Sequence, residues 1–87
     1  MYKVNYLETA LEDLKNLDKP TLTRIKSKIE NHLVKDPNGL GKPLQGTLKG
    51  LWKYRIGDFR VIYKIISKDV LILIAQIGHR KEIYREK

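Results

Sequence analysis

The hydrophobic pattern changes its period soon after the start of the chain. Tyr2, Val4 and Tyr6 alternate with polar residues, which is typical of a short, half-buried strand. From Leu7 onward the apolar residues recur with helical spacing instead. The positions expected on the buried face of this first helix are Leu7, Ala10, Leu11, Leu14 and Leu17. The pattern therefore predicts a strand that leads directly into an amphipathic helix.

A second amphipathic helix follows after a short break. Asp18-Lys19-Pro20 interrupts the first helix and starts the next, with Asp18 as a candidate N-cap and Pro20 in the first turn. Its expected buried residues are Leu22, Ile25, Ile29 and Leu33. Because the connection is short, we expect the two helices to form an antiparallel hairpin. The turn residues Asp36-Pro37-Asn38-Gly39 end this helical hairpin. Residues 40–50 show no clear period and are predicted to form a loop.

Three strand patterns fill the second half of the chain. Residues 51–56 and 59–66 are separated by Gly57-Asp58, a pair of residues that favours a tight two-residue hairpin. Ser67 to Asp69 form the next turn, and residues 70–77 form the last strand. These elements predict consecutive antiparallel strands.

We expect Gly78 to stop the last strand and residues 79–85 to form one terminal helical turn. The element order is then β-α-α-β-β-β, without a repeat or a linker. Residues 1–87 are predicted to form a single domain of the α+β class. Its architecture is an antiparallel sheet with the N-terminal helical hairpin packed on one face.

Composition limits the chemistry. The 87 residues, 41% of them hydrophobic, suffice for one small core. The absence of cysteine excludes disulfides and thiolate metal sites, and two histidines, His32 and His79, are too few for a convincing metal site. We therefore expect neither a metal nor a cofactor. The longest apolar run, Val70 to Ala75, is far below the about 20 residues that a membrane span needs. With no basic-then-apolar leader, we expect a cytoplasmic protein without a membrane partner.

The net charge of +8 indicates an anionic partner. Residues 1–42 carry 8 Lys and Arg against 6 Asp and Glu, whereas residues 43–87 carry 10 against 4. The excess thus belongs to the second half of the chain. The alternative interpretation is a solvated basic surface that confers solubility.

Strand alternation places this charge on one face of the hairpin. If Gly57-Asp58 is the loop, Arg55 lies opposite Arg60 and Lys53 opposite Ile62. The expected core face consists of Trp52, Tyr54, Ile56, Phe59, Val61, Tyr63 and Ile65. The three cations then gather on the other face. A shift of the register by one residue would move them apart.

The predicted pairing of Arg55 with Arg60 has a cost. Like charges directly opposite each other in a sheet destabilise it, on the scale of about 0.2–1 kcal/mol for a cross-strand pair. An anion bound between them would remove that repulsion. The alternative is that these cations only discourage aggregation, as charges on exposed strands often do.

The C-terminal segment adds a second candidate group. On a helical turn Arg80 and Tyr84 share one side, and an arginine with an aromatic ring suits single-stranded RNA. Tyr84 could equally anchor the tail by packing. For His79, at a strand end, a structural or hydrogen-bonding role is favoured over a general base, and His32 is expected on the helix surface.

Three segments of the chain, together with the element order, resemble the RelE/ParE superfamily of toxins. They are KPLQG (residues 42–46), LWKYRIGDFRVIY (51–63) and IGHRKEIY (77–84). The RelE branch implies the toxin of a type II toxin–antitoxin system, a metal-independent and ribosome-dependent endoribonuclease that cleaves mRNA in the ribosomal A site and inhibits translation. It also implies a cognate RelB-like antitoxin that wraps the toxin, and a complex that commonly binds operator DNA.

The resemblance assigns catalytic work to the same residues, namely Lys53, Arg55, Arg60, Arg80 and Tyr84. Some members have lysine where this chain has Arg55. Because arginine stays protonated, Arg55 is expected to clamp phosphate, which leaves Lys53 as the candidate general base. Attack of the RNA 2′-hydroxyl on the adjacent phosphate is the implied reaction.

Three other functions share these features. A ParE-type toxin has the same fold but inhibits DNA gyrase and is no nuclease, and the sheet cations would then be surface charges. A non-enzymatic nucleic-acid-binding module would show salt-sensitive binding without turnover. A degenerate toxin would bind its antitoxin and harm nothing.

Overall fold

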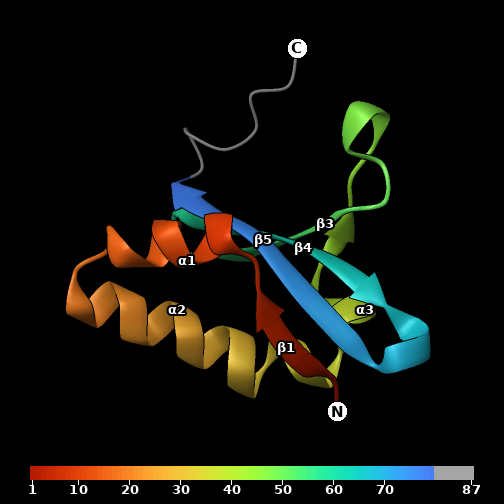
Figure 1. Ribbon diagram of the computed structural model, residues 1–87, viewed down its shortest axis with the longest axis horizontal. Coiled ribbons are helices and arrows are strands. Elements are labelled where there is room, and N and C mark those ends of the chain that lie inside the picture. Colours follow the sequence, from red (N-terminus) through yellow and green to blue (C-terminus); the bar gives the residue numbers. More distant parts are fainter. Residues whose placement is uncertain (80–87) are drawn as a thin grey trace.

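The computed structural model describes residues 1–79, so Arg80, Tyr84 and all but the first residue of the predicted terminal turn lie outside the described residues. Within residues 1–79 the chain forms a five-stranded sheet with the order β1-β5-β4-β3-β2 (Figure 1). The elements are β1 (Lys3–Tyr6), α1 (Glu8–Lys15), α2 (Lys19–Asn31), α3 (Pro37–Leu40), β2 (Lys42–Pro43), β3 (Trp52–Ile56), β4 (Phe59–Ile66) and β5 (Leu71–His79). The predicted α+β class is confirmed.

The prediction of a wholly antiparallel sheet is wrong at one edge. β1 pairs parallel with β5, from Lys3 opposite Leu71 to Tyr6 opposite Ile74, while the other strand pairs are antiparallel. A parallel pair needs a long connection between its strands, and the helices together with β2 to β4 provide it. Alternation along β1 indicates which side chains are buried, but it carries no information about strand direction.

Two further boundaries differ from the sequence prediction. Residues 40–50 are not entirely a loop, because β2 pairs Lys42 with Lys53 and Pro43 with Trp52. The last strand does not stop at Gly78 but continues to His79, with Gly78 paired opposite Arg60. Both strand segments are held by long-range pairing rather than by a local pattern.

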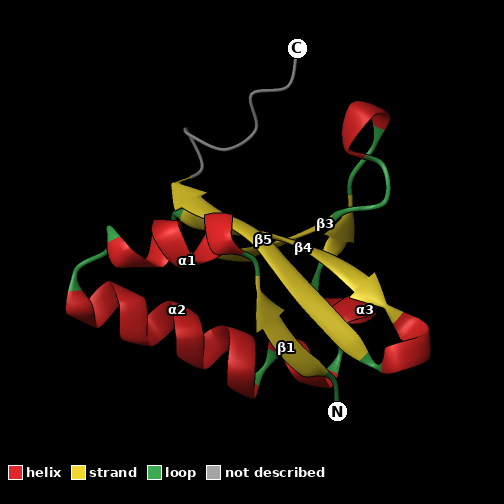
Figure 2. Ribbon diagram, viewed as in Figure 1, coloured by secondary structure: helices red, strands yellow, loops and turns green. Residues whose placement is uncertain are grey.

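Helices α1 and α2 form the predicted hairpin beside the sheet (Figure 2). Asp18 is the N-cap residue of α2, and a hydrogen bond with the Thr21 side chain lowers the pKa of its carboxyl group. The expected face of α2 is confirmed, since Ile25 and Ile29 are fully buried and Leu22 packs against the core.

The predicted face of α1 is wrong for Leu7 and Leu11, which are 43% and 45% exposed. This helix runs along the edge of β5 beyond the end of β1, where its polar side chains serve the strand. The Thr9 hydroxyl donates to the Ala75 carbonyl at 2.6 Å, and the Asp13 carboxylate accepts from the Ile77 amide at 2.8 Å. These bonds satisfy backbone groups of an otherwise open strand edge and turn Leu7 and Leu11 away from the sheet.

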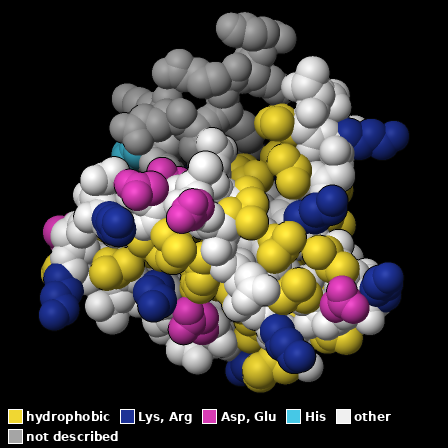
Figure 3. All heavy atoms as spheres, in the orientation of Figure 1, with side chains coloured by type: hydrophobic (Ala, Val, Ile, Leu, Met, Phe, Trp, Pro, Cys, Tyr) yellow, Lys and Arg dark blue, Asp and Glu magenta, His cyan; other side chains and the backbone are white. Residues whose placement is uncertain are grey.

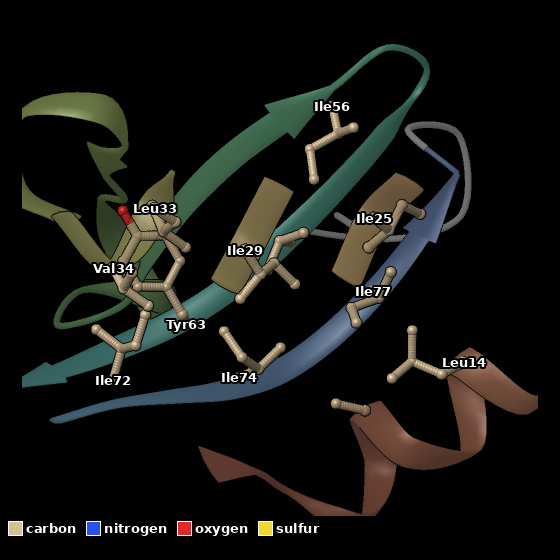
Figure 4. Close-up of a cluster of buried hydrophobic side chains, with 12 residues drawn as sticks. Leu14, Ile25, Ile29, Leu33, Val34, Ile56, Tyr63, Ile72, Ile74 and Ile77 are labelled. Atoms are coloured by element: carbon tan, nitrogen blue, oxygen red, sulfur yellow. The ribbon is translucent and has the colours of Figure 1, made fainter. Parts of the chain in front are cut away.

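The core lies between the helices and one face of the sheet (Figure 4). Its largest fully buried side chains include Tyr63, Ile25, Ile29, Leu33, Ile72 and Ile74. The expected core face of the hairpin is confirmed, because Ile56, Val61 and Tyr63 are buried and the remaining four residues pack against the cluster. In residues 1–79 no helix is long and apolar enough to cross a membrane.

Candidate functional site

The β3–β4 hairpin has the predicted register. Ile56 lies opposite Phe59, Arg55 opposite Arg60, and Lys53 opposite Ile62. Because side chains alternate along a strand, the three cations lie on the sheet face that is turned away from the core. The prediction that Lys53, Arg55 and Arg60 share one face is therefore confirmed.

A pocket of about 160 Å³ opens on this face, lined by Leu40, Lys42, Lys53, Arg55 and Arg60. We call it the cationic pocket. Among the lining residues that the structure describes, four of five are cations and none is a carboxylate. On the molecular face drawn in Figure 3, by contrast, basic, acidic and hydrophobic side chains are interspersed. A concave site of one charge sign attracts and concentrates anions.

The two arginines are held in different ways. The Nε of Arg55 donates to the Gly57 carbonyl at 3.2 Å, in the turn that Gly57 makes with a φ of 59°. This bond uses one of five guanidinium N–H groups and fixes the orientation of the group. Arg60 is only partly exposed, and its neighbour on β5 is Gly78, which has no side chain. Both arginines line the pocket.

Lys42 is the one cation among the described lining residues that the sequence analysis does not predict as a site residue. It comes from β2, a strand of two residues that is too short to show alternation. Its position directly across from Lys53 places both amines on the same face of the sheet. The sequence feature that points to Lys42 is the KPLQG segment (residues 42–46), which begins with this lysine and is one of the three segments that resemble the family.

The two histidines lie outside the pocket lining. The ring of His79 meets the Phe59 ring edge-on, with 5.8 Å between centroids, and this contact fits the predicted structural role. His32 is exposed at the C-terminal cap of α2, as expected. Among residues 1–79, no three His, Cys, Asp or Glu side chains are grouped so that they could hold a metal ion. The positive charge of the described site comes from its lysines and arginines.

The fold and the cationic pocket define a small basic α+β protein with a site suited to an anion. The family described as the ParE toxin of the type II toxin–antitoxin system parDE matches residues 4–84. The chain belongs to this RelE/ParE superfamily, and within it the similar proteins are RelE-type toxins.

The relatives cover nearly the whole chain. Toxin RelG of Mycobacterium tuberculosis is 32% identical over 84 residues, which is 97% of both chains. Toxin RelE of the same organism is 34% identical and covers 97% of this chain and 87% of its own. The toxin–antitoxin complex RelBE2 from M. tuberculosis contains a similar fold, with a TM-score of 0.87, 30% identity, and coverage of 91% of this chain and 98% of that one.

Proposed function

We propose that this toxin is a ribosome-dependent, metal-independent endoribonuclease that cleaves mRNA in the ribosomal A site and thereby inhibits translation. The observation that carries the proposal is the cationic pocket, in which four basic side chains meet and no acid occurs among the lining residues within 1–79. The similarity of this chain to RelE-type toxins over nearly its whole length supports the same assignment.

The proposed reaction is attack of a 2′-hydroxyl on the adjacent phosphorus. The 2′-oxygen–phosphorus bond forms and the bond from phosphorus to the 5′-oxygen breaks, which gives a 2′,3′-cyclic phosphate and a 5′-hydroxyl. One proton leaves the 2′-hydroxyl and one is returned to the departing 5′-oxygen. Alignment of these atoms and stabilisation of the negative charge on phosphorus are the main requirements.

The residues of this chain divide these tasks by their chemistry. Lys53 is the proposed general base, because an arginine does not give up its proton. Arg55, Arg60 and Arg80 are proposed to stabilise the phosphate, and Tyr84 to stack on or orient the nucleotide. The roles proposed for Arg80 and Tyr84 rest on the sequence alone, because both residues lie outside the described residues.

The side chains that line the pocket support the proposed dependence on the ribosome. Cations stabilise charge well, but the lining in the described part of the chain includes no histidine pair for acid and base catalysis. We therefore expect feeble cleavage of free RNA, with the ribosome holding the substrate in line.

The proposed partner that restrains the toxin is a RelB-like antitoxin, as the toxin–antitoxin complex RelBE2 suggests by its similarity. To neutralise the cationic pocket, such an antitoxin should be acidic where it crosses this face. The resulting complex is proposed to bind operator DNA.

The test is cleavage on purified ribosomes programmed with a defined mRNA and mapped by primer extension. Wild-type protein should produce a stop in the A-site codon, and Lys53→Ala should remove it. Lys68→Ala is the matched control, since Lys68 is exposed in the turn between β4 and β5 and removes the same charge. Absence of cleavage by the folded wild-type protein would reject the nuclease assignment.

Inhibition of DNA gyrase is the second candidate, because the matching family is described as the ParE toxin. It predicts inhibition of gyrase-driven supercoiling without ribosomal cleavage. Under this function Lys53→Ala and Lys68→Ala should have equally small effects.

A further inference from the structure

We propose that Lys42 gives the cationic pocket a second phosphate-binding position, so that the pocket holds one nucleotide by the phosphates on both its 5′ and 3′ sides. This inference rests on the proposed function, since it specifies how the same pocket binds RNA. It adds a binding residue, Lys42, to the residues proposed above for the reaction.

The first argument is the arrangement of the four cations in two pairs. Lys42 and Lys53 lie directly opposite each other on β2 and β3, and Arg55 and Arg60 lie directly opposite each other on β3 and β4. Lys53 and Arg55 are two residues apart on β3, so the pairs are separated by about 6.6–6.8 Å along the strand. The Arg55–Arg60 pair and Lys42 therefore lie at two separate positions along the sheet, and a phosphate can bind at each while Lys53 stays available as the general base.

The second argument is that Lys42 is held in place by buried contacts. Tyr63 is fully buried, and its hydroxyl donates to the Pro37 carbonyl at 2.7 Å, which ties α3 to the sheet. Gly41 lies against that hydroxyl and against the Lys53 carbonyl so closely that an added Cβ would clash with both. The residue before Lys42 is therefore fixed between two elements, and the lysine follows directly from that anchor.

The third argument concerns space and cost. A single water needs only about 10–15 Å³ of such space, so a pocket of about 160 Å³ has room for phosphate groups as well as solvent. Like charges directly opposite each other are unfavourable in a sheet, so the position of Lys42 across from Lys53 is one that suits an anion. An anchored Lys42 that faces Lys53 thus repeats, at the sheet edge, the arrangement of Arg55 and Arg60.

The test uses adenosine 3′,5′-bisphosphate, which carries a phosphate on both sides of one nucleoside, and compares it with adenosine 5′-monophosphate and 3′-monophosphate. Dissociation constants are measured by calorimetry at low salt. The wild-type protein should bind the bisphosphate at least about tenfold more tightly than either monophosphate, the size expected for one additional charge-assisted contact.

Lys42→Gln should reduce this preference to near unity while leaving the tighter of the two monophosphates almost unaffected. Lys49→Gln is the matched control, because Lys49 is exposed in the same connection, removes the same charge and does not line the pocket. Full bisphosphate preference in Lys42→Gln, or equal loss in both variants, would overturn the proposal.

A second variant separates the position of Lys42 from its charge. Gly41→Ala retains every cation but pushes against Tyr63, and it should lower the bisphosphate preference as Lys42→Gln does. If Gly41→Ala fails to fold, Lys42→Arg replaces it and should keep most of the preference, because the charge remains. These measurements contain no cleavage step, so a wild-type protein that binds the bisphosphate in this way but cuts no ribosomal mRNA refutes the nuclease function alone.

Discussion

The two faces of the β3–β4 hairpin differ in what they do for the protein, although neighbouring residues of the same strands supply both. Ile56 and Val61 point into the core and are 4% and 0% exposed, while Arg55 and Arg60 point to the cationic pocket. One face contributes apolar burial, which stabilises the fold. The other gathers like charges, which costs stability but suits an anion. Substitutions on the two faces should therefore affect different measurements.

The largest effect is expected at Lys53 on the pocket face. Lys53→Ala should lower ribosomal mRNA cleavage by about 10²–10⁴-fold, the usual contribution of a positioned general base. Lys53→Arg should lose nearly as much, because it keeps the charge but cannot accept a proton. Single-turnover cleavage on programmed ribosomes measures both, with Lys68→Ala as the control. Retention of wild-type cleavage by Lys53→Arg would restrict Lys53 to an electrostatic role.

The core into which this hairpin face packs is tested by a matched pair of substitutions in α1, because Leu14 belongs to the same buried cluster as Ile56 and Val61. Leu14 is 7% exposed and Leu11 is 45% exposed, on the same helix. Leu14→Ala should lower the free energy of unfolding by about 3–5 kcal/mol, through lost transfer energy and the cavity left behind. Leu11→Ala should change it by less than about 0.5 kcal/mol. Urea denaturation measures both, and equal losses would mean that α1 packs with the face predicted from the sequence.

The hairpin could be predicted from sequence because its determinants are local. Alternation along residues 51–66 and the turn Gly57-Asp58 together define the register, and with it the face shared by Lys53, Arg55 and Arg60. Helix α2 could also be predicted locally, because the helical spacing of its apolar residues defines a single face and that face packs on the core.

The features that were missed depend on contacts between distant segments. The direction of β1 relative to its neighbour depends on its pairing with β5, which lies more than 60 residues later in the chain. The buried face of α1 depends on the hydrogen bonds that Thr9 and Asp13 make with the edge of β5. Lys42 joins the pocket only because Gly41 fits against Tyr63. A strand of two residues is too short for its hydrophobic pattern to predict this packing. The roles of Arg80 and Tyr84 stay predictions.

An intermediate effect is expected from the tyrosine that links the core to the pocket edge. Tyr63→Phe removes the buried hydrogen bond to the Pro37 carbonyl and should cost about 1–2 kcal/mol at neutral pH. Burial raises the pKa of the Tyr63 hydroxyl above its ordinary value. Above pH 10 the unfolded chain therefore loses this proton while the folded protein keeps it, and stability falls by about 1.4 kcal/mol per pH unit.

This dependence gives the tyrosine substitution a signature in pH. The stability difference between the wild-type protein and Tyr63→Phe should shrink as the pH rises above 10, because only the wild-type protein carries the Tyr63 contribution. Tyr6, whose pKa is also raised by burial and by its hydrogen bond to Glu30, remains in both proteins and cancels. Denaturation at a series of pH values measures the difference, and a constant difference would contradict this explanation.

The smallest effect is expected at Arg55, whose position opposite Arg60 on the pocket face lowers the stability of the sheet. Arg55→Gln removes the repulsion with Arg60, worth about 0.2–1 kcal/mol, and loses the bond to the Gly57 carbonyl, a similar amount. Salt separates the two contributions, because it screens the repulsion but not the hydrogen bond. As salt rises, the stability difference should therefore shift in favour of the wild-type protein by up to about 1 kcal/mol. Lys49→Gln changes the net charge equally and should show a smaller shift, since Lys49 does not line the pocket. If both variants respond to salt alike, Arg55 and Arg60 repel each other no more than other surface charges do. The pocket face would then not lower the stability of the protein, as the comparison of the two faces requires.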